Sequence, residues 1–140
     1  MGRDAETTVD LLEAMRAALD SVDRLLRGRV VDIEMARLQV VTDPALFQRV
    51  FAALISASVA QSEPPNGITV RVARSGKNAR IEVINEGGPA VRQGIELDTT
   101  EAEDFRSIGG DIGTAGPADG GIYYWMSVPV VAGTSHAADG

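Results

Sequence analysis

The sequence of 140 residues has no cysteine, one histidine and only six aromatic residues, namely three Phe, two Tyr and one Trp. Without cysteine the chain has no disulfide framework and no thiolate site, which fits a reducing compartment, so we expect a cytoplasmic location. No apolar run approaches the roughly 20 residues that a membrane-spanning helix needs, and no signal peptide is evident. We therefore expect a protein that is not inserted in a membrane.

Positive charge is also scarce. Lys and Arg number 13 against 20 Asp and Glu, which gives a net charge of −7 and an isoelectric point near 4.6. This balance argues against a nucleic-acid partner held by phosphate contacts and favours a protein or a small molecule. The length suits one domain with one core. We expect a flexible N-terminus over 1–7, a single domain over 8–130 and a flexible tail over 131–140.

The clearest element is a helix over 43–62. Asp43 can cap its first turn, and Pro44 suits the first helical position, where no N–H is needed. Apolar residues recur every three or four positions and predict one buried face. They are Phe47, Val50, Phe51, Leu54, Ile55 and Val59. Most other positions hold only small side chains, so the rest of the helix offers little to a ligand.

Other patterns complete an α+β fold. An amphipathic pattern predicts a helix over 8–27, and alternation predicts strands over 30–35, 38–41, 68–74, 79–84 and 121–130. A short strand is expected over 111–114, whereas 90–107 has weak periodicity and a cluster of acids, which is typical of a solvated loop or short helix. Each strand has one apolar face. The order predicts a two-layer sandwich, a mixed sheet of about five strands with two long helices on one face.

Several segments in this order resemble the catalytic and ATP-binding domain of sensor histidine kinases, which belongs to the GHKL ATPase class. They are VVDI at 30–33, VTDP at 41–44, the helix over 46–62, GITVRV at 67–72 and IEVINEGGP at 81–89. The stretches 107–112, 120–122 and 128–130 are similar to that domain's last two strands. The resemblance covers about residues 8 to 130 and implies Mg-ATP chemistry in two-component or phosphorelay signalling.

Key positions depart from the family pattern. The resemblance implies asparagines on the long helix, the second holding Mg²⁺, and the matching residues are Ala53 and Ala57. A methyl group cannot ligate a cation that demands oxygen. Asn85 stands where the family has the Asp that accepts the adenine amino group, although its amide oxygen remains an acceptor. Gly87 is kept, but Gly88 is followed by a proline, which removes a donor and restricts φ.

The family also has a mobile lid, a glycine-rich phosphate loop and a third helix. Here only 90–107 separates the two flanking motifs, with Gly94 as its single glycine, so we expect no phosphate cradle. We also expect the third helix to be missing and part of the sheet or helix flank to be bare. The glycines at 109, 110, 113 and 116 are interpreted as a turn and loop. His136 lies in the tail, and the family's phosphorylated histidine lies on a separate helical hairpin, so we assign it no role.

We therefore predict no catalytic residue, no metal site and no cofactor. The vestigial nucleotide-binding positions are Ala53, Ala57, Asn85, Gly87 and Gly88, and the candidate partner surface is Ala53, Ala57, Ala60, Tyr123 and Trp125. For Tyr123 and Trp125, a covered sheet face is an equal alternative. The predicted function is that of a degenerate histidine kinase-type domain acting by protein contact without ATP turnover, on a signalling partner or a second copy. The alternatives are a lid-free nucleotide-binding kinase domain using Mg-ATP, and an anti-sigma-type regulator.

Overall fold

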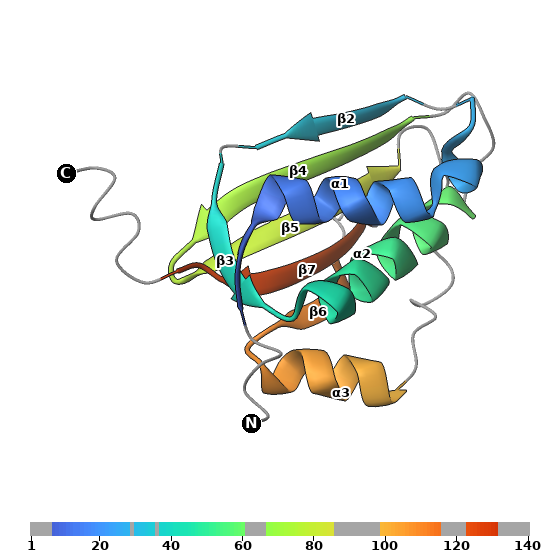
Figure 1. Ribbon diagram of the computed structural model, residues 1–140. Helices are drawn as coiled ribbons and strands as arrows, with labels where there is room; N and C mark the ends of the chain where they lie inside the picture. The colour runs from blue at the N-terminus through green and yellow to red at the C-terminus, as the bar shows by residue number, and fades with distance from the viewer. Residues whose placement is uncertain are drawn as a thin grey trace.

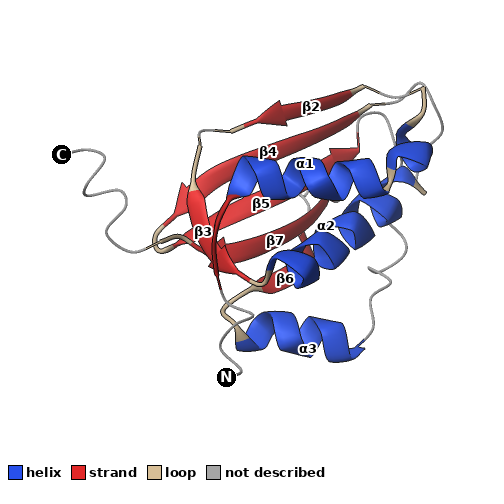
Figure 2. Cartoon of the chain, viewed as in Figure 1, coloured by secondary structure: helices blue, strands red, loops and turns tan. Residues whose placement is uncertain are grey.

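The computed structural model describes residues 7–28, 30–35, 37–60, 67–85, 99–115 and 123–131. They form two layers, a five-stranded sheet and helices packed on one of its faces (Figure 1, Figure 2). The sheet order is β2-β4-β5-β7-β6; β2 runs parallel to β4, and the other neighbours are antiparallel. The strands are β2 (Val31–Glu34), β4 (Ile68–Ser75), β5 (Asn78–Asn85), β6 (Asp111–Ala115) and β7 (Tyr123–Pro129). The predicted α+β fold with a mixed five-stranded sheet is confirmed.

The N-terminal segment departs from the prediction of a helix over 8–27. Strand β1 (Thr7–Asp10) pairs antiparallel with β3 (Gln39–Thr42) in a separate two-stranded sheet. β-Branched residues fill the first three positions of β1 and favour an extended chain. The residues of β1 also fit the apolar spacing of the helix that follows them. The apolar pattern alone therefore did not indicate a separate strand.

Helix α1 (Leu11–Ser21) begins three residues later than predicted, because the Asp10 carboxylate caps it. This carboxylate accepts a hydrogen bond of 3.1 Å from the backbone N–H of Glu13. After α1 the chain tightens into the 3₁₀ helix η2 (Asp23–Leu26), so the predicted continuous helix is also wrong at its C-terminal end. The fully buried residues of α1 are Leu11, Met15 and Ala18, which recur every three or four positions as the amphipathic pattern requires.

Helix α2 (Pro44–Val59) confirms the predicted long helix and its cap. The Asp43 carboxylate accepts hydrogen bonds from the N–H groups of Ala45 and Leu46, at 3.0 and 3.3 Å. The rings of Phe47 and Phe51 stack with centroids 5.9 Å apart. The apolar face of α2 is buried against the sheet, and its residues are Leu46, Phe47, Val50, Phe51, Leu54 and Ile55.

The strands predicted over 68–74 and 79–84 are also confirmed, and β4 and β5 form an antiparallel hairpin. Gly76 and Lys77 form its turn, and Gly76 has a φ of 62°, a conformation that glycine adopts without a steric penalty. Strand alternation places one set of side chains in the core and the other on the far side of the sheet. The buried set is Ile68, Val70, Val72, Ala79, Ile81 and Val83.

A third helix, α3 (Thr99–Ser107), overturns the expectation that this element is missing. Phe105 anchors it and is fully buried, and a Cβ built on Gly110 would lie 2.5 Å from the Phe105 ring. Since α3 packs beside α2, the bare strip predicted there is wrong. The short helix that the sequence left open within 90–107 is therefore present, although weak periodicity did not decide between helix and loop, because one aromatic residue anchors an otherwise polar segment.

Among the described residues no helix is long and apolar enough to span a bilayer. Thr7 lies in β1, and the N–H of Val131 donates to the carbonyl of Gln39 at 2.9 Å. The rest of the predicted flexible ends, 1–6 and 132–140, lie outside the described residues.

Candidate functional site

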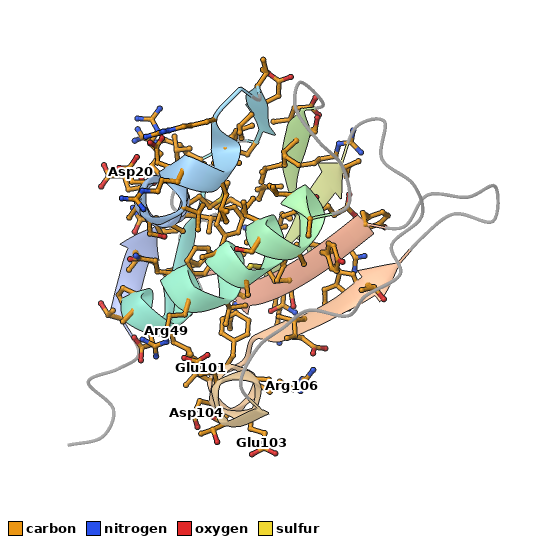
Figure 3. All side chains as sticks on the ribbon, turned by 90° about the vertical axis from the view of Figure 1, so that its right-hand side faces the viewer. Asp20, Arg49, Glu101, Glu103, Asp104 and Arg106 are labelled. Carbon is orange, nitrogen blue, oxygen red and sulfur yellow. The ribbon has the colours of Figure 1, made fainter. Side chains whose placement is uncertain are left out.

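The first candidate is the flank of α2 that faces α3. Ala53 and Ala57 are half-buried there, one and two turns beyond Arg49 on the same side of the helix. Arg49 forms an ion pair with Glu101 of α3, so this side of α2 is turned toward α3 (Figure 3). Ala57 also packs against the apolar core. The two positions therefore offer only methyl groups, which bind neither a metal ion nor a phosphate.

The nearby carboxylates do not complete a metal site on this flank. Glu101 is paired with Arg49, and Glu103 points away from α2 in Figure 3. In the part of the chain that the structure describes, no group of three or more His, Cys, Asp or Glu residues is placed to hold a metal ion. Asn85 ends β5, in register with Ile68, while Gly87 and Gly88 lie outside the described residues.

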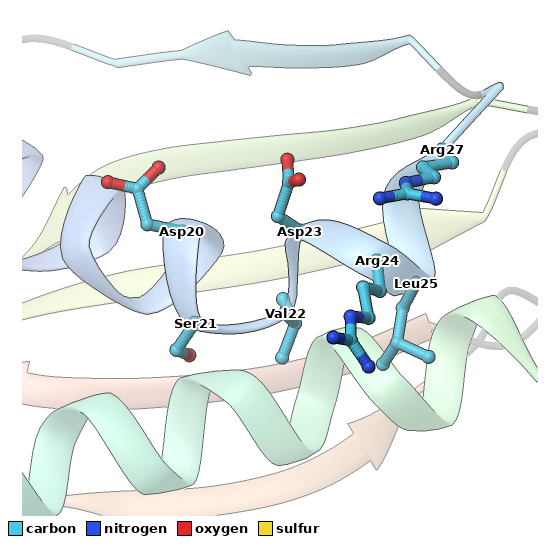
Figure 4. A pocket seen from close by; sticks show the side chains of 7 residues that line it. All are labelled: Asp20, Ser21, Val22, Asp23, Arg24, Leu25 and Arg27. Carbon is cyan, nitrogen blue, oxygen red and sulfur yellow. The ribbon is translucent and has the colours of Figure 1, made fainter.

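A second surface feature is a groove of about 530 Å³ along η2 (Figure 4). Its lining residues are Asp20, Ser21, Val22, Asp23, Arg24, Leu25 and Arg27. The carboxylates of Asp20 and Asp23 point away from the Arg24 side chain, and Leu25 is 44% exposed. The charged groups of the groove thus face solvent in different directions and do not converge on one point.

The third candidate is the face of the sheet opposite the helices, here called the open face. No described helix lies on it (Figure 1). Tyr123 and Trp125 are half-buried on this face, whereas Tyr124 and Met126 point into the core. The predicted partner surface is therefore divided: its alanines lie on the helical side of the sheet and its aromatic residues on the other.

Arg80 of β5 contacts three other side chains of the open face. Its guanidinium lies 4.6 Å from the centroid of the Trp125 ring, its Nε donates to Glu82 Oε2 at 3.1 Å, and its Nη2 donates to the Tyr123 hydroxyl at 3.4 Å. Burial by itself lowers the pKa of Arg80, but the hydrogen bonds to Tyr123 and Glu82 outweigh it and raise that pKa above its ordinary value. The indole of Trp125 packs against Gly113 of β6. A Cβ added to that glycine would lie 2.8 Å from the indole ring.

Beside this cluster lies a small hollow of about 200 Å³. Its lining residues are Ser75, Asn78, Arg80, Asp111, Trp125 and Ser127. Four strands, β4 to β7, contribute to it, so residues distant in sequence meet there. Sequence reasoning identified Trp125 but missed Arg80. The outward position of Arg80 in a strand of alternating pattern was a signal, but only the pairing of β5 with β7 shows that it meets the indole.

The fold is similar to those of several solved structures. The chain matches a mycobacterial sensor histidine kinase, MprB, with a TM-score of 0.73 at 16% identity, over 89% of this chain and 97% of that one. It matches the catalytic domain of histidine kinase ThkA with a TM-score of 0.67 at 18% identity, over 89% and 96%. The chain has the fold of a histidine kinase catalytic domain.

A further match is the histidine kinase AdeS of Acinetobacter baumannii, with a TM-score of 0.68 at 14% identity, over 91% of this chain and 68% of that one. No family model matches the sequence, and no curated protein matches it. The histidine kinase fold predicted from the resemblance is therefore confirmed by structure, at a level of identity that speaks for the fold alone.

Proposed function

We propose that this chain is a histidine kinase-type ATPase domain that acts in two-component or phosphorelay signalling by contact with a protein, without turning over ATP. The observation that carries this proposal is the flank of α2, where Ala53 and Ala57 occupy the positions that the resemblance assigns to asparagines. Aliphatic side chains cannot replace the oxygen ligands that Mg²⁺ requires. The α3 carboxylate nearest this flank, Glu101, is held by Arg49.

The choice of a protein partner has support from one of the structural matches. That structure is histidine kinase ThkA in complex with the response regulator protein TrrA, and this chain covers 42% of that ThkA chain at 18% identity. A domain that has lost its metal ligand and keeps its fold retains a surface on which such a partner can bind. We propose a partner of the same signalling class, with self-association as a competing outcome.

Calorimetry with Mg-ATP and Mg-ADP tests the loss of nucleotide chemistry. We expect no heat of binding and no shift in melting temperature at millimolar nucleotide, because neither Ala53 nor Ala57 supplies an oxygen ligand that offsets the cost of desolvating the cation. A clear saturable heat, or ATP hydrolysis by the purified chain, would overturn the proposal. Solution mass measured in parallel reports whether the chain is a monomer.

The variant Ala57→Asn sharpens this test. Restoring one amide oxygen is not expected to restore phosphotransfer, because a phosphate cradle is still needed. Ala60→Asn serves as the control, since it adds the same amide at an exposed position at the end of α2. Phosphotransfer by Ala57→Asn alone would show that the rest of the nucleotide site is intact.

A further inference from the structure

Strand β2 forms one edge of the five-stranded sheet. It pairs with β4 on one side, and no described strand or helix lies along its other side (Figure 1). The opposite edge of the sheet, β6, differs because α3 packs beside it. A strand edge with free backbone groups is a template with which another strand can pair.

The register of β2 with β4 determines which backbone groups of β2 point outward. The carbonyl of Val30 accepts a hydrogen bond of 2.9 Å from the N–H of Ile68, the residue of β4 that lies opposite Val31. Because the backbone groups of successive residues in a strand point to opposite sides, those of Asp32 also point toward β4. The N–H and C=O groups of Val31 and Ile33 therefore point to the outer edge, where no described strand pairs with them.

The side chains of this edge differ between the two faces of the sheet. Val31 and Ile33 are half-buried and pack against the core. Asp32 and Glu34 alternate with them and are exposed on the open face. Glu34 is paired with Arg71, whereas Asp32 forms no ion pair within the described part of the chain. A strand added here therefore meets apolar side chains on one face and an unpaired carboxylate on the other.

The charge of β2 argues against a second copy of this chain as the occupant. If two copies of β2 paired antiparallel about Asp32, the two Asp32 carboxylates would lie opposite each other. Pairing about Ile33 would place Asp32 opposite Glu34. Like charges directly opposite each other destabilise a strand pair, and each copy also carries a net charge of −7. A strand with a cation opposite Asp32 meets neither penalty.

From these observations we propose that the outer edge of β2 is the docking site for an extended basic segment of a partner protein, which adds a strand to the sheet. The segment runs antiparallel to β2, because antiparallel pairs are slightly more stable than parallel pairs. Its backbone pairs with Val31 and Ile33, its apolar side chains lie beside these two residues, and a cation lies opposite Asp32. This inference rests on the proposed function and adds the binding site and the chemistry of the partner segment.

Fluorescence anisotropy of a labelled hexapeptide of alternating Lys and Val tests the charge requirement, at low salt and with no nucleotide present. We expect saturable binding that weakens as salt is added. Asp32→Lys is expected to weaken binding of this peptide about tenfold, because the charge opposite the peptide is reversed. For the same reason Asp32→Lys is expected to strengthen binding of a hexapeptide of alternating Glu and Val.

The matched control is Glu103→Lys, which makes the same charge change at an exposed residue of α3. It is expected to bind the Lys and Val peptide as the parent protein does. Equal weakening in Asp32→Lys and Glu103→Lys would overturn the proposal, because net charge alone would then explain binding. Circular dichroism confirms that both variants are folded.

N-methylated peptides test whether the backbone of the segment pairs with β2. In an antiparallel pair, the N–H groups that face Val31 and Ile33 belong to the peptide residues whose side chains share their face, which are the valines. N-methylation of every Val is therefore expected to abolish binding, whereas N-methylation of every Lys is expected to leave it unchanged. Equal affinities of the two methylated peptides, or the reverse order, would overturn the proposed antiparallel pairing.

Three other outcomes would also overturn the proposal. Two are the absence of saturable binding, and equal binding of the Glu and Val peptide by the parent protein. The third is a dimer of the peptide-free protein that Asp32→Lys strengthens, which would assign the edge to a second copy. Because these titrations contain no nucleotide, their failure is distinct from failure of the calorimetric test of the proposed function.

Discussion

The two faces of the same five strands are built in opposite ways. The face under the helices is apolar and fully buried along β4, β5 and β7, for example at Val70, Ile81 and Met126. The open face carries a row of alternating charge across the sheet, from Glu34 through Arg71 to Glu82. Burial of apolar area supplies most folding free energy, so the covered face holds the domain together. The open face contributes less apolar burial and carries charged side chains of both signs.

The largest expected effect that tests this contrast is on the covered face. Phe51→Ala should lower the free energy of unfolding by about 3–5 kcal/mol, because Phe51 is fully buried between α2 and the sheet and its loss leaves a cavity. Trp125→Ala removes a larger side chain from the open face and should cost only about 1–2 kcal/mol, since that indole is only partly buried. Urea denaturation of both variants measures the difference. Equal losses would show that the two faces contribute alike.

Two glycines, Gly110 just before β6 and Gly113 within it, give a finer comparison. A Cβ on Gly110 would meet the ring of Phe105 at 2.5 Å, and a Cβ on Gly113 would meet the indole of Trp125 at 2.8 Å. Phe105 is fully buried and cannot move aside, so Gly110→Ala should cost about 1–3 kcal/mol. Gly113→Ala should cost less than about 1 kcal/mol, because the partly exposed indole can shift toward solvent. A shift in Trp125 emission in Gly113→Ala, and none in Gly110→Ala, would accompany this result.

The ion pairs of the open face should contribute little to stability. Arg71 Nε lies 3.2 Å from Glu34 Oε1, but the two side chains are 53% and 59% exposed, so solvent screens their attraction. Arg71→Gln is expected to change the free energy of unfolding by less than about 1 kcal/mol, and the difference should vanish in high salt. A loss that persists in 1 M salt would contradict the expectation that this exposed ion pair adds little to stability.

The smallest expected effect is on the pH dependence of the free energy of unfolding, and it appears only at alkaline pH. Burial raises the pKa of the Tyr124 hydroxyl above its ordinary value of 10.0. Above pH 10 the unfolded chain therefore loses this proton more readily than the folded chain, so the free energy of unfolding falls as the pH rises. Tyr124→Phe removes this titration and should flatten the alkaline part of the pH dependence. Matching alkaline slopes in the two proteins would show that the hydroxyl is not desolvated.

Much of the fold was predictable because local patterns and tertiary burial agree. In α2 the Asp43 cap, Pro44 and the apolar spacing all indicate one helix, and in the hairpin Gly76 and strict alternation indicate one turn and two strands. The histidine kinase fold followed from the order of these segments. Where the pattern was weak, as in α3, one buried residue, Phe105, decides the structure, and its burial depends on Gly110 and β6 rather than on its own neighbours in sequence.

The candidate site also has some features that the sequence determines and others that only the tertiary structure shows. The sequence alone determined that the long helix carries methyl groups at Ala53 and Ala57 in place of oxygen ligands, because that conclusion depends only on which residue stands at each position. It also placed Tyr123 and Trp125 on the outward side of a strand. Only the tertiary structure decided that Arg80 lies against Trp125, that Gly113 supports the indole and that α3 covers the edge of the sheet. Strand register and helix packing set those contacts, and both arise from segments far apart in the chain.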